Sequence, residues 1–221
     1  MTTTSTSIPA VEKSPTVRTN DPARTMQEIL NVATEEFASK GLAGARIDAI
    51  AEETRTSKRM IYYYFGSKEK LYLAVLEESY RKMRRIESEL HLEDLDPEEA
   101  LKKLVGFTFD HHFSNPDYIR LVMTENIQRG EYLAQSEVIR ELNTSVIKTI
   151  RQLYERGVKV GVFRAGLDPI DIHASISALS FFNVSNQYTF DWIFKNQKSI
   201  EVNNEARRNS IIDMVLRFVK R

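Results

Sequence analysis

The sequence predicts an all-α protein with a helix-turn-helix domain followed by a larger helical domain. Three observations support this. Glycine and proline are scarce, at 8 and 6 of 221 residues. Apolar residues recur at helical rather than alternating spacing, and several prolines stand where a helix would begin. We expect a disordered arm at residues 1–20, the helix-turn-helix domain at 21–66 and the larger domain at 67–221.

The composition narrows the classes of protein. Lysine and arginine number 31, as do aspartate and glutamate, so binding to nucleic acid must depend on local charge. The absence of cysteine excludes disulfides, thiolate zinc sites and cysteine nucleophiles. No apolar run resembles a signal peptide or reaches membrane-spanning length. We expect a cytoplasmic protein without membrane association or cofactor.

The N-terminal arm is rich in Thr and Ser and has few apolar side chains to bury. Lys13, Arg18 and Arg24 could let the arm contact a polyanion, and an inert tail is the alternative that composition favours.

Order is expected from Asp21, an N-cap followed by proline, and the first helix should stop at Gly41. A short helix at 47–53, a polar break and a second short helix capped by Ser57 follow. Ser67 then caps a long amphipathic helix. Two short helices joined by a few polar residues and preceded by a longer one form a helix-turn-helix.

The rest of the chain reads as further helices, with no strand and no internal repeat. Their expected ranges are 97–113, 116–129, 137–160, 169–182 and 205–219.

The stretch TSKRMIYYYFGSKEKL places four consecutive aromatic residues between basic clusters. If Ser57 is the N-cap, Ile61 and Phe65 can point inward together while Lys58 and Arg59 point outward. Residues 54–70 hold five basic residues and one acid, which makes a basic patch on a neutral protein. Either the aromatic residues are core, as we expect for Phe65 and at least one tyrosine, or the segment contacts bases and phosphates. Spacing alone leaves both open.

The segment IAEETRTSKRMIYYYFGSKEKLYLAVL resembles the N-terminal domain of the TetR family of transcriptional regulators. The matching features are the Ile50-Ala51 pair, Ser57, an aromatic pair separated by two residues, and Ser-Lys-Glu before a leucine. The resemblance implies a homodimer that lays the second short helix in the major groove of a palindromic, double-stranded operator. Position by position, the implied DNA contacts are Arg46, Ser57, Lys58, Arg59, Tyr62, Tyr63 and Lys68.

Two positions depart from the family pattern. The family usually has an Ala-Gly pair at the turn, where this chain has Thr54-Arg55, and a threonine cap where it has Ala45-Arg46. Arg55 would be strained if its φ is positive.

The resemblance also implies that the larger domain binds a small organic effector. Rings and amides that could line a pocket for a planar or partly apolar ligand are Phe109, His112, Phe113, Tyr118, Asn126, Tyr154, Asn183 and Trp192. The alternative is that these rings pack the core. Asp110, His111 and His112 suggest a metal, but adjacent helical side chains diverge by about 100°, so we expect no metal site.

Two surfaces remain. RKMRR at 81–85 has glutamates at helical spacing on both sides and reads as a solvated helix face rather than a second polyanion site. The helices at 169–182 and 205–219 carry more apolar surface than one layer needs, and in the family the last two long helices form the dimer interface. The interface candidates are Ile172, Ile176, Leu179, Phe182, Ile212, Val215, Leu216 and Val219.

The resulting hypothesis is a ligand-responsive repressor. An enzyme could be imagined from Asp110 with His111, or Glu125 with Arg120, but no nucleophile, phosphate loop or metal-ligand pattern accompanies them, so no catalytic residue is assigned. A protein-interaction module with a vestigial DNA-binding domain is the other alternative.

Overall fold

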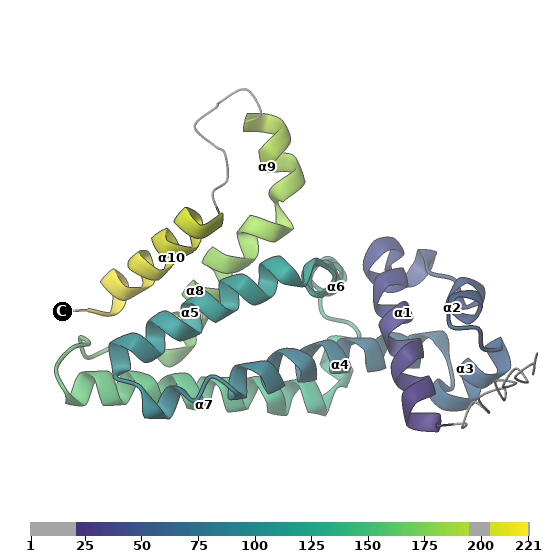
Figure 1. The fold of residues 1–221 in the computed structure, drawn as a ribbon, viewed down its shortest axis with the longest axis horizontal. Helices are drawn as coiled ribbons and strands as arrows, with labels where there is room; N and C mark the ends of the chain where they lie inside the picture. Colours follow the sequence, from purple (N-terminus) through teal and green to yellow (C-terminus); the bar gives the residue numbers. More distant parts are fainter. Residues whose placement is uncertain (1–20, 195–203, 221) are drawn as a thin grey trace, which may run out of the picture.

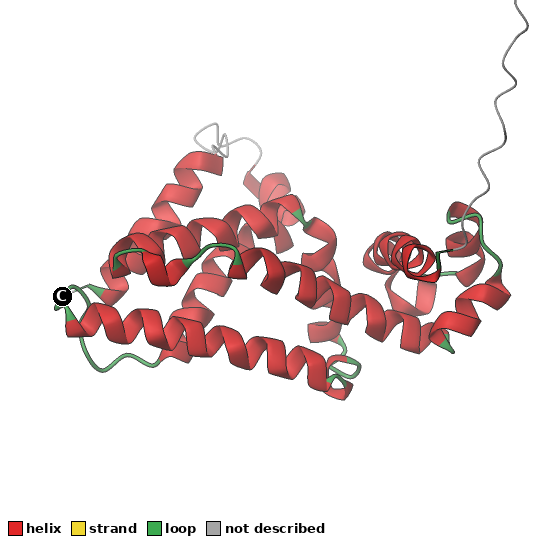
Figure 2. Ribbon diagram, turned by 60° about the horizontal axis from the view of Figure 1, so that its bottom comes forward, coloured by secondary structure: helices red, strands yellow, loops and turns green. Residues whose placement is uncertain are grey.

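The computed structural model describes residues 21–194 and 204–220, and within these ranges the chain forms ten α-helices (Figures 1 and 2). The all-α prediction is confirmed; the arm predicted at 1–20 lies outside the described residues. In this part of the chain β structure is limited to one bridge between Phe163 and Lys220. The helices are α1 (Pro22–Gly44), α2 (Ile47–Glu53), α3 (Lys58–Phe65), α4 (Lys68–Ser88), α5 (Pro97–Ser114), α6 (Pro116–Ile127), α7 (Glu137–Lys159), α8 (Pro169–Ser185), α9 (Gln187–Phe194) and α10 (Asn204–Val219), with 3₁₀ turns η1 (Leu92–Asp94) and η2 (Leu133–Gln135).

Most helix starts follow from local capping. Asp21 accepts from the backbone N–H of Ala23 at 3.1 Å, and the hydroxyls of Ser57 and Ser67 cap α3 and α4 in the same way. Gly41 has a φ of 65°, so the regular part of α1 ends there and a kinked turn follows. The short helix α9 was not expected, because no proline marks its start and a single residue separates it from α8.

Two apolar cores divide the molecule. Helices α1 to α3 form the head at one end, and α4 leads from the head into the other helices (Figure 1). The head core contains Ile29, Phe37 and Ile61 but also Leu121 of α6 and Ile139 of α7. The second core fills the space between α5, α7, α8 and α10. The head is therefore packed directly onto α6 through α1, while α7 packs on α4, and the contact with α6 gives the head's orientation a physical link to the larger domain.

None of the helices in residues 21–194 and 204–220 combines the length and apolar content needed to cross a membrane.

Candidate nucleic-acid interface

Helix α3 is fixed at both ends and along one side. The Ser57 hydroxyl accepts from the N–H of Met60 at 3.2 Å, and Gly66, with a φ of 81°, ends the helix. Ile61 is 1% exposed and anchors the inner side in the head core, with Tyr64 and Phe65 packed partly buried against that core. Only the other side of the helix is free to meet a partner.

The outer side of α3 presents Lys58, Arg59, Tyr62 and Tyr63, all exposed. Tyr63 is 77% exposed and Tyr62 44% exposed, which is unusual for large aromatic side chains and leaves ring and hydroxyl available. Counted from Lys58, the others follow one, four and five positions later, which at about 100° per residue places all four within an arc of about 140° on the outer half of the helix. Figure 1 places α3 at the end of the molecule remote from the C-terminus.

Asp48 of α2 holds two of the predicted DNA contacts. It forms ion pairs with Lys58 and, at 3.8 Å, with Arg46. All three side chains are about half exposed or more, so these pairs contribute little stability and can be exchanged for phosphate contacts. Arg59 has no such pair among the described residues, which leaves its guanidinium free for base edges or phosphates.

Lys68 lies in the first turn of α4, where its ammonium donates to the carbonyl of Ala43 at 3.4 Å. This long bond, together with the helix N-terminus, places a positive charge beside the turn after α1. The exposed Ser57 already uses its hydroxyl as a cap, so a phosphate there would meet the backbone N–H groups of the first turn as much as the side chain.

The turn between α2 and α3 has the usual backbone geometry, although Arg55 stands where the family usually has glycine. Arg55 adopts a φ of 50°, the left-handed region that glycine enters without strain. The backbone remains tied down, since the N–H of Thr56 donates to the carbonyl of Ala51 at 3.0 Å and that of Arg55 to Glu52 at 3.1 Å. The arginine is strained, but the turn keeps its shape.

Of the predicted effector contacts, the structure brings together His112 and Tyr118. Their ring centroids are 6.0 Å apart, and Tyr118 also contacts Tyr80 of α4 at 5.5 Å. His112 is 4% exposed, and burial, followed by the charge of nearby groups, lowers its pKa to about 4. On its other side the imidazole contacts Phe181 of α8 at 6.1 Å.

Three buried polar atoms of α4, α5 and α8 have no hydrogen-bond partner. They are Nδ1 of His112, Nε of Arg84 and Oγ of Ser180, which we call the buried polar cluster. Arg84 is close enough to lower the pKa of His112 further, and Ser180 precedes Phe181, whose ring contacts His112. A buried unsatisfied polar atom costs roughly 1–3 kcal/mol, so each of the three calls for a ligand or water.

The remaining predicted effector contacts do not join this cluster. Phe109 is buried and stacks on the half-exposed Phe113 at 6.5 Å, and Asn126 donates to its own helix at Val122. The Tyr154 hydroxyl donates to the carbonyl of Arg164 at 2.8 Å and accepts from the N–H of Leu167 at 3.0 Å.

Asn183 donates to the carbonyl of Leu179 and accepts from Arg207, while Trp192 on α9 is 79% exposed. Sequence spacing brought these residues into one presumed domain, but it could not decide which side of each helix they occupy.

The predicted dimer residues separate into three groups. Five of them are at most 7% exposed and pack into the subunit's own core, where they offer no surface to a partner: Ile172, Ile176, Val215, Leu216 and Val219. Leu179 and Ile212 are partly buried against the same core. Phe182 is 46% exposed and lies on the outer surface, as do Ile170 and Met214 on the same two helices.

Two buried charged residues correct the sequence interpretation. Arg84 belongs to the segment read as a solvated face, yet its side chain is 11% exposed because it pairs with Glu87 and donates to Asn143 at 3.1 Å. Glu125 is 2% exposed and does not pair with Arg120. It accepts from the Tyr72 hydroxyl at 2.9 Å and from the N–H of Leu133 at 2.9 Å. No residue pattern distinguishes these side chains from exposed ones.

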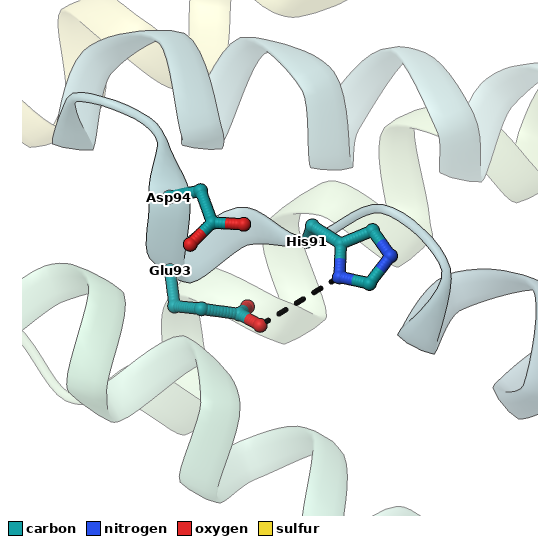
Figure 3. Close-up of side chains that lie close together, drawn as sticks. All are labelled: His91, Glu93 and Asp94. Carbon is teal, nitrogen blue, oxygen red and sulfur yellow. Dashed lines mark ion pairs between the residues drawn. The ribbon is translucent and has the colours of Figure 1, made fainter.

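A group of potential metal ligands lies away from the head. His91, Glu93 and Asp94 stand together in the loop around η1, with their ligand atoms within 4.8 Å of one another (Figure 3). All three are exposed, and Nδ1 of His91 lies 3.8 Å from Glu93. Exposed acidic groups of this kind are common without a metal, and we assign none.

Both the N-terminal and the C-terminal part of the chain match families of known proteins. Residues 29–75 match the family described as bacterial regulatory proteins, tetR family, and residues 97–215 match the tetracyclin repressor-like C-terminal domain. The transcriptional repressor NicS of Pseudomonas putida is 36% identical over 78% of this chain and 82% of its own length. The transcriptional repressor SCO4008 of Streptomyces coelicolor is 34% identical over 62% of this chain and 69% of its own length.

Solved structures agree on the fold. SCO4942 from Streptomyces coelicolor has a TM-score of 0.69 at 29% identity, over 88% of this chain and 98% of that one. FadR from Bacillus subtilis, in complex with stearoyl-CoA, has a TM-score of 0.66 over 86% of this chain and 97% of that one. At 20% identity the second likeness concerns the fold alone.

Proposed function

The chain belongs to the TetR family of bacterial transcriptional regulators, and we propose that it is a homodimeric repressor that binds a palindromic operator through α3 and is released by a small organic effector. The names of NicS and SCO4008 as transcriptional repressors support that direction of control. The family is one of regulators and not of enzymes.

The observation that carries the proposal is the outer face of α3. It displays two cations and two tyrosines at the end of the molecule, while Ile61 holds the opposite face in the core. Arg59 is the residue we assign to base edges, with guanine its best-matched target, and Tyr62 and Lys68 to phosphates. Two heads roughly 34–36 Å apart would enter successive major grooves of one duplex.

The effector would occupy the buried polar cluster beside His112 and Tyr118. Oxygens of the ligand can accept from Arg84 and Ser180, and a planar ring can pack against the imidazole or the phenol. Such a ligand weakens DNA binding only by as much as it prefers the released form of the dimer.

The dimer would form through the outer surfaces of α8 and α10. Phe182, Ile170 and Met214 supply exposed apolar area there, while the buried residues of the same helices keep that surface rigid. Sedimentation at micromolar concentration tests this. We expect a dimer that Phe182→Asp dissociates and that Ile127→Asp, on the exposed end of α6, leaves intact; a monomeric parent protein would contradict the proposal.

Fluorescence anisotropy with a palindromic duplex from beside the protein's own gene tests DNA binding. Lys58→Ala/Arg59→Ala should weaken specific binding by at least about 100-fold with no loss of thermal stability, since both side chains are exposed. The charge-matched control is Lys148→Ala/Arg151→Ala, two exposed cations on α7. Equal losses in both variants, or equal affinity for every duplex, would overturn the assignment.

A further inference from the structure

Asp48 of α2 is the acid that contacts the outer face of α3. Among the described residues, its pair with Lys58 is the ion pair that joins α3 to another helix. Its second oxygen lies 3.8 Å from the guanidinium of Arg46, just before α2. Two cations from different segments therefore meet one carboxylate at the end of the molecule where α2 and α3 lie together (Figure 1).

The backbone on both sides of Asp48 is held in place by the head. Ile47 and Ile50 are 7% and 0% exposed and belong to the head core. The N–H of Arg46 donates to Oε1 of Glu36 on α1 at 2.9 Å, which fixes the start of α2. The carboxylate is therefore presented from a rigid backbone, as a group that reads a sequence must be.

Both members of the Asp48–Lys58 pair keep hydrogen-bonding capacity for a partner. The side chain of Lys58 is 57% exposed and that of Asp48 is 47% exposed. An ammonium has three donors and a carboxylate about four acceptor sites, so the ion pairs leave donors on Lys58 and a free site on each oxygen of Asp48. The surface thus presents a donor and an acceptor side by side.

A carboxylate at this surface weakens binding to DNA in general. It repels the phosphates of any sequence, and it holds two cations that would otherwise contact them. An exposed ion pair and a position in the first turn of α2 both add little folding stability to offset this loss. What Asp48 can supply is discrimination, because a carboxylate accepts a hydrogen bond from a base donor and finds none on a phosphate.

In the major groove this donor and acceptor match one orientation of one base pair. The N4 amine of cytosine is a donor that lies beside the O6 acceptor of its guanine. Cytosine can therefore donate to Asp48 while Lys58 donates to O6 and N7 of guanine. The reversed pair sets donor against donor and acceptor against acceptor. An adenine–thymine pair offers N6 and O4 in the right order, but it sets adenine N7 beside the carboxylate and the thymine methyl group beside the ammonium.

We propose that Asp48 and Lys58 together read one C·G base pair in each half of the operator, with the cytosine bound by Asp48. This inference rests on the proposed function and adds α2 to the surface that reads the sequence. On any other base pair Lys58 turns to a phosphate and leaves Asp48 without a base donor. The pair therefore weakens binding to wrong sequences as well as strengthening binding to the right one.

Selection of bound duplexes from a random-sequence library, followed by sequencing, tests the proposal. The parent protein should recover a cytosine at one position of each half-site, preferred at least about tenfold over the other three bases. Asp48→Ala should lose the preference at that position alone. Asp48→Asn should change the preference from cytosine to adenine, because an amide matches N6 and N7 of adenine.

The matched control is Glu53→Ala, which removes an exposed acid from the same helix at about 140° from Asp48. It should leave every position of the recovered site unchanged. Lys58→Ala should relax the position that Asp48→Ala relaxes, and the double variant should relax it no further, because the two side chains act as a unit. Circular dichroism checks that each variant is folded, as expected for exposed side chains.

Anisotropy with a duplex that lacks the recovered site measures the effect on wrong sequences. Asp48→Ala should bind this duplex at least about threefold more tightly than Glu53→Ala does. Lys58 and Arg46, once freed, each neutralise a phosphate, so the slope of log affinity against log salt should steepen by about 1 to 2.

The proposal is wrong if Asp48→Ala recovers the same site as the parent protein, or if its preferences weaken at all positions together. Equal affinity of Asp48→Ala and Glu53→Ala for the unrelated duplex would also contradict it. A parent protein that enriches no sequence would overturn the proposed function instead.

Discussion

Polar side chains are exposed on the outer face of α3 and buried on the inner face of α5. On α3 the cations and tyrosines are exposed, and what pairs they have are surface pairs with Asp48. On α5 two neighbouring histidines are buried, each with a nitrogen that has no partner. Exposed groups await a partner at little cost to stability, whereas buried unpaired groups lower stability until a partner arrives.

This difference predicts which property a substitution in each region should change. A substitution on the outer face of α3 should alter DNA affinity and leave the free energy of unfolding unchanged. A substitution among the buried polar groups should alter stability first.

The largest expected effect is the loss of folding stability at acid pH, which comes from the buried histidines of α5. The pKa values of His111 and His112 fall from an ordinary 6.5 to about 4 in the fold, so the unfolded chain binds more protons between these values. Stability is therefore complete above about pH 6.5 and declines as the pH falls toward 4, by up to about 3 kcal/mol for each imidazole. Urea unfolding across this range measures the slope. His111→Gln/His112→Gln should reduce the slope to the part that His173 contributes, because burial lowers its pKa as well, and His91→Gln, an exposed control, should leave the slope unchanged.

Glu125→Ala should give the next largest effect. It removes the acceptor of the Tyr72 hydroxyl and of two backbone N–H groups at the junction of α4, α6 and η2. Leaving these donors buried and unpaired should reduce the free energy of unfolding by about 3 kcal/mol. Urea denaturation is the measurement, with Glu131→Ala, an exposed neighbour, as control. If Glu125→Ala lost no more unfolding free energy than Glu131→Ala, water would have to replace the carboxylate at the junction.

Gly157→Ala tests how rigid the second core is. A Cβ there would lie 1.9 Å from the ring of Phe163, which is 2% exposed and held by the bridge to Lys220. Overpacking should outweigh the better helix propensity and cost about 2 kcal/mol net. In Gly106→Ala the clash is with the flexible end of Arg208, so the thermal midpoint should hardly move. Equal effects would mean that the Phe163 ring can move aside.

Arg55→Gly should have the smallest effect. It relieves a φ of 50°, and the gain is reduced by the greater freedom of glycine in the unfolded chain, so stability should rise by about 0.5 kcal/mol. Arg55→Ala keeps the strained backbone and should show no gain. If alanine stabilises the head as much as glycine, the effect belongs to the removed charge and not to the backbone.

Apart from α9, the sequence by itself determined the helices and the face of α3. Capping residues such as Asp21, Ser57 and Ser67 act on their own backbone, and helical spacing places Ile61 opposite Arg59, so both can be read without knowing the fold. The kink at Gly41 is equally local.

Only the tertiary structure decided which polar side chains are buried and which apolar ones are free. Arg84 and Arg85 are neighbours of the same type, yet the side chain of Arg84 is largely covered and that of Arg85 is exposed, because α7 packs over one side of α4. The sequence made Ile176 and Phe182 equal candidates for an interface. In the structure Ile176 is buried in the core beside α10, and Phe182 is exposed. Burial depends on what lies across from a side chain, and that neighbour comes from a distant part of the chain.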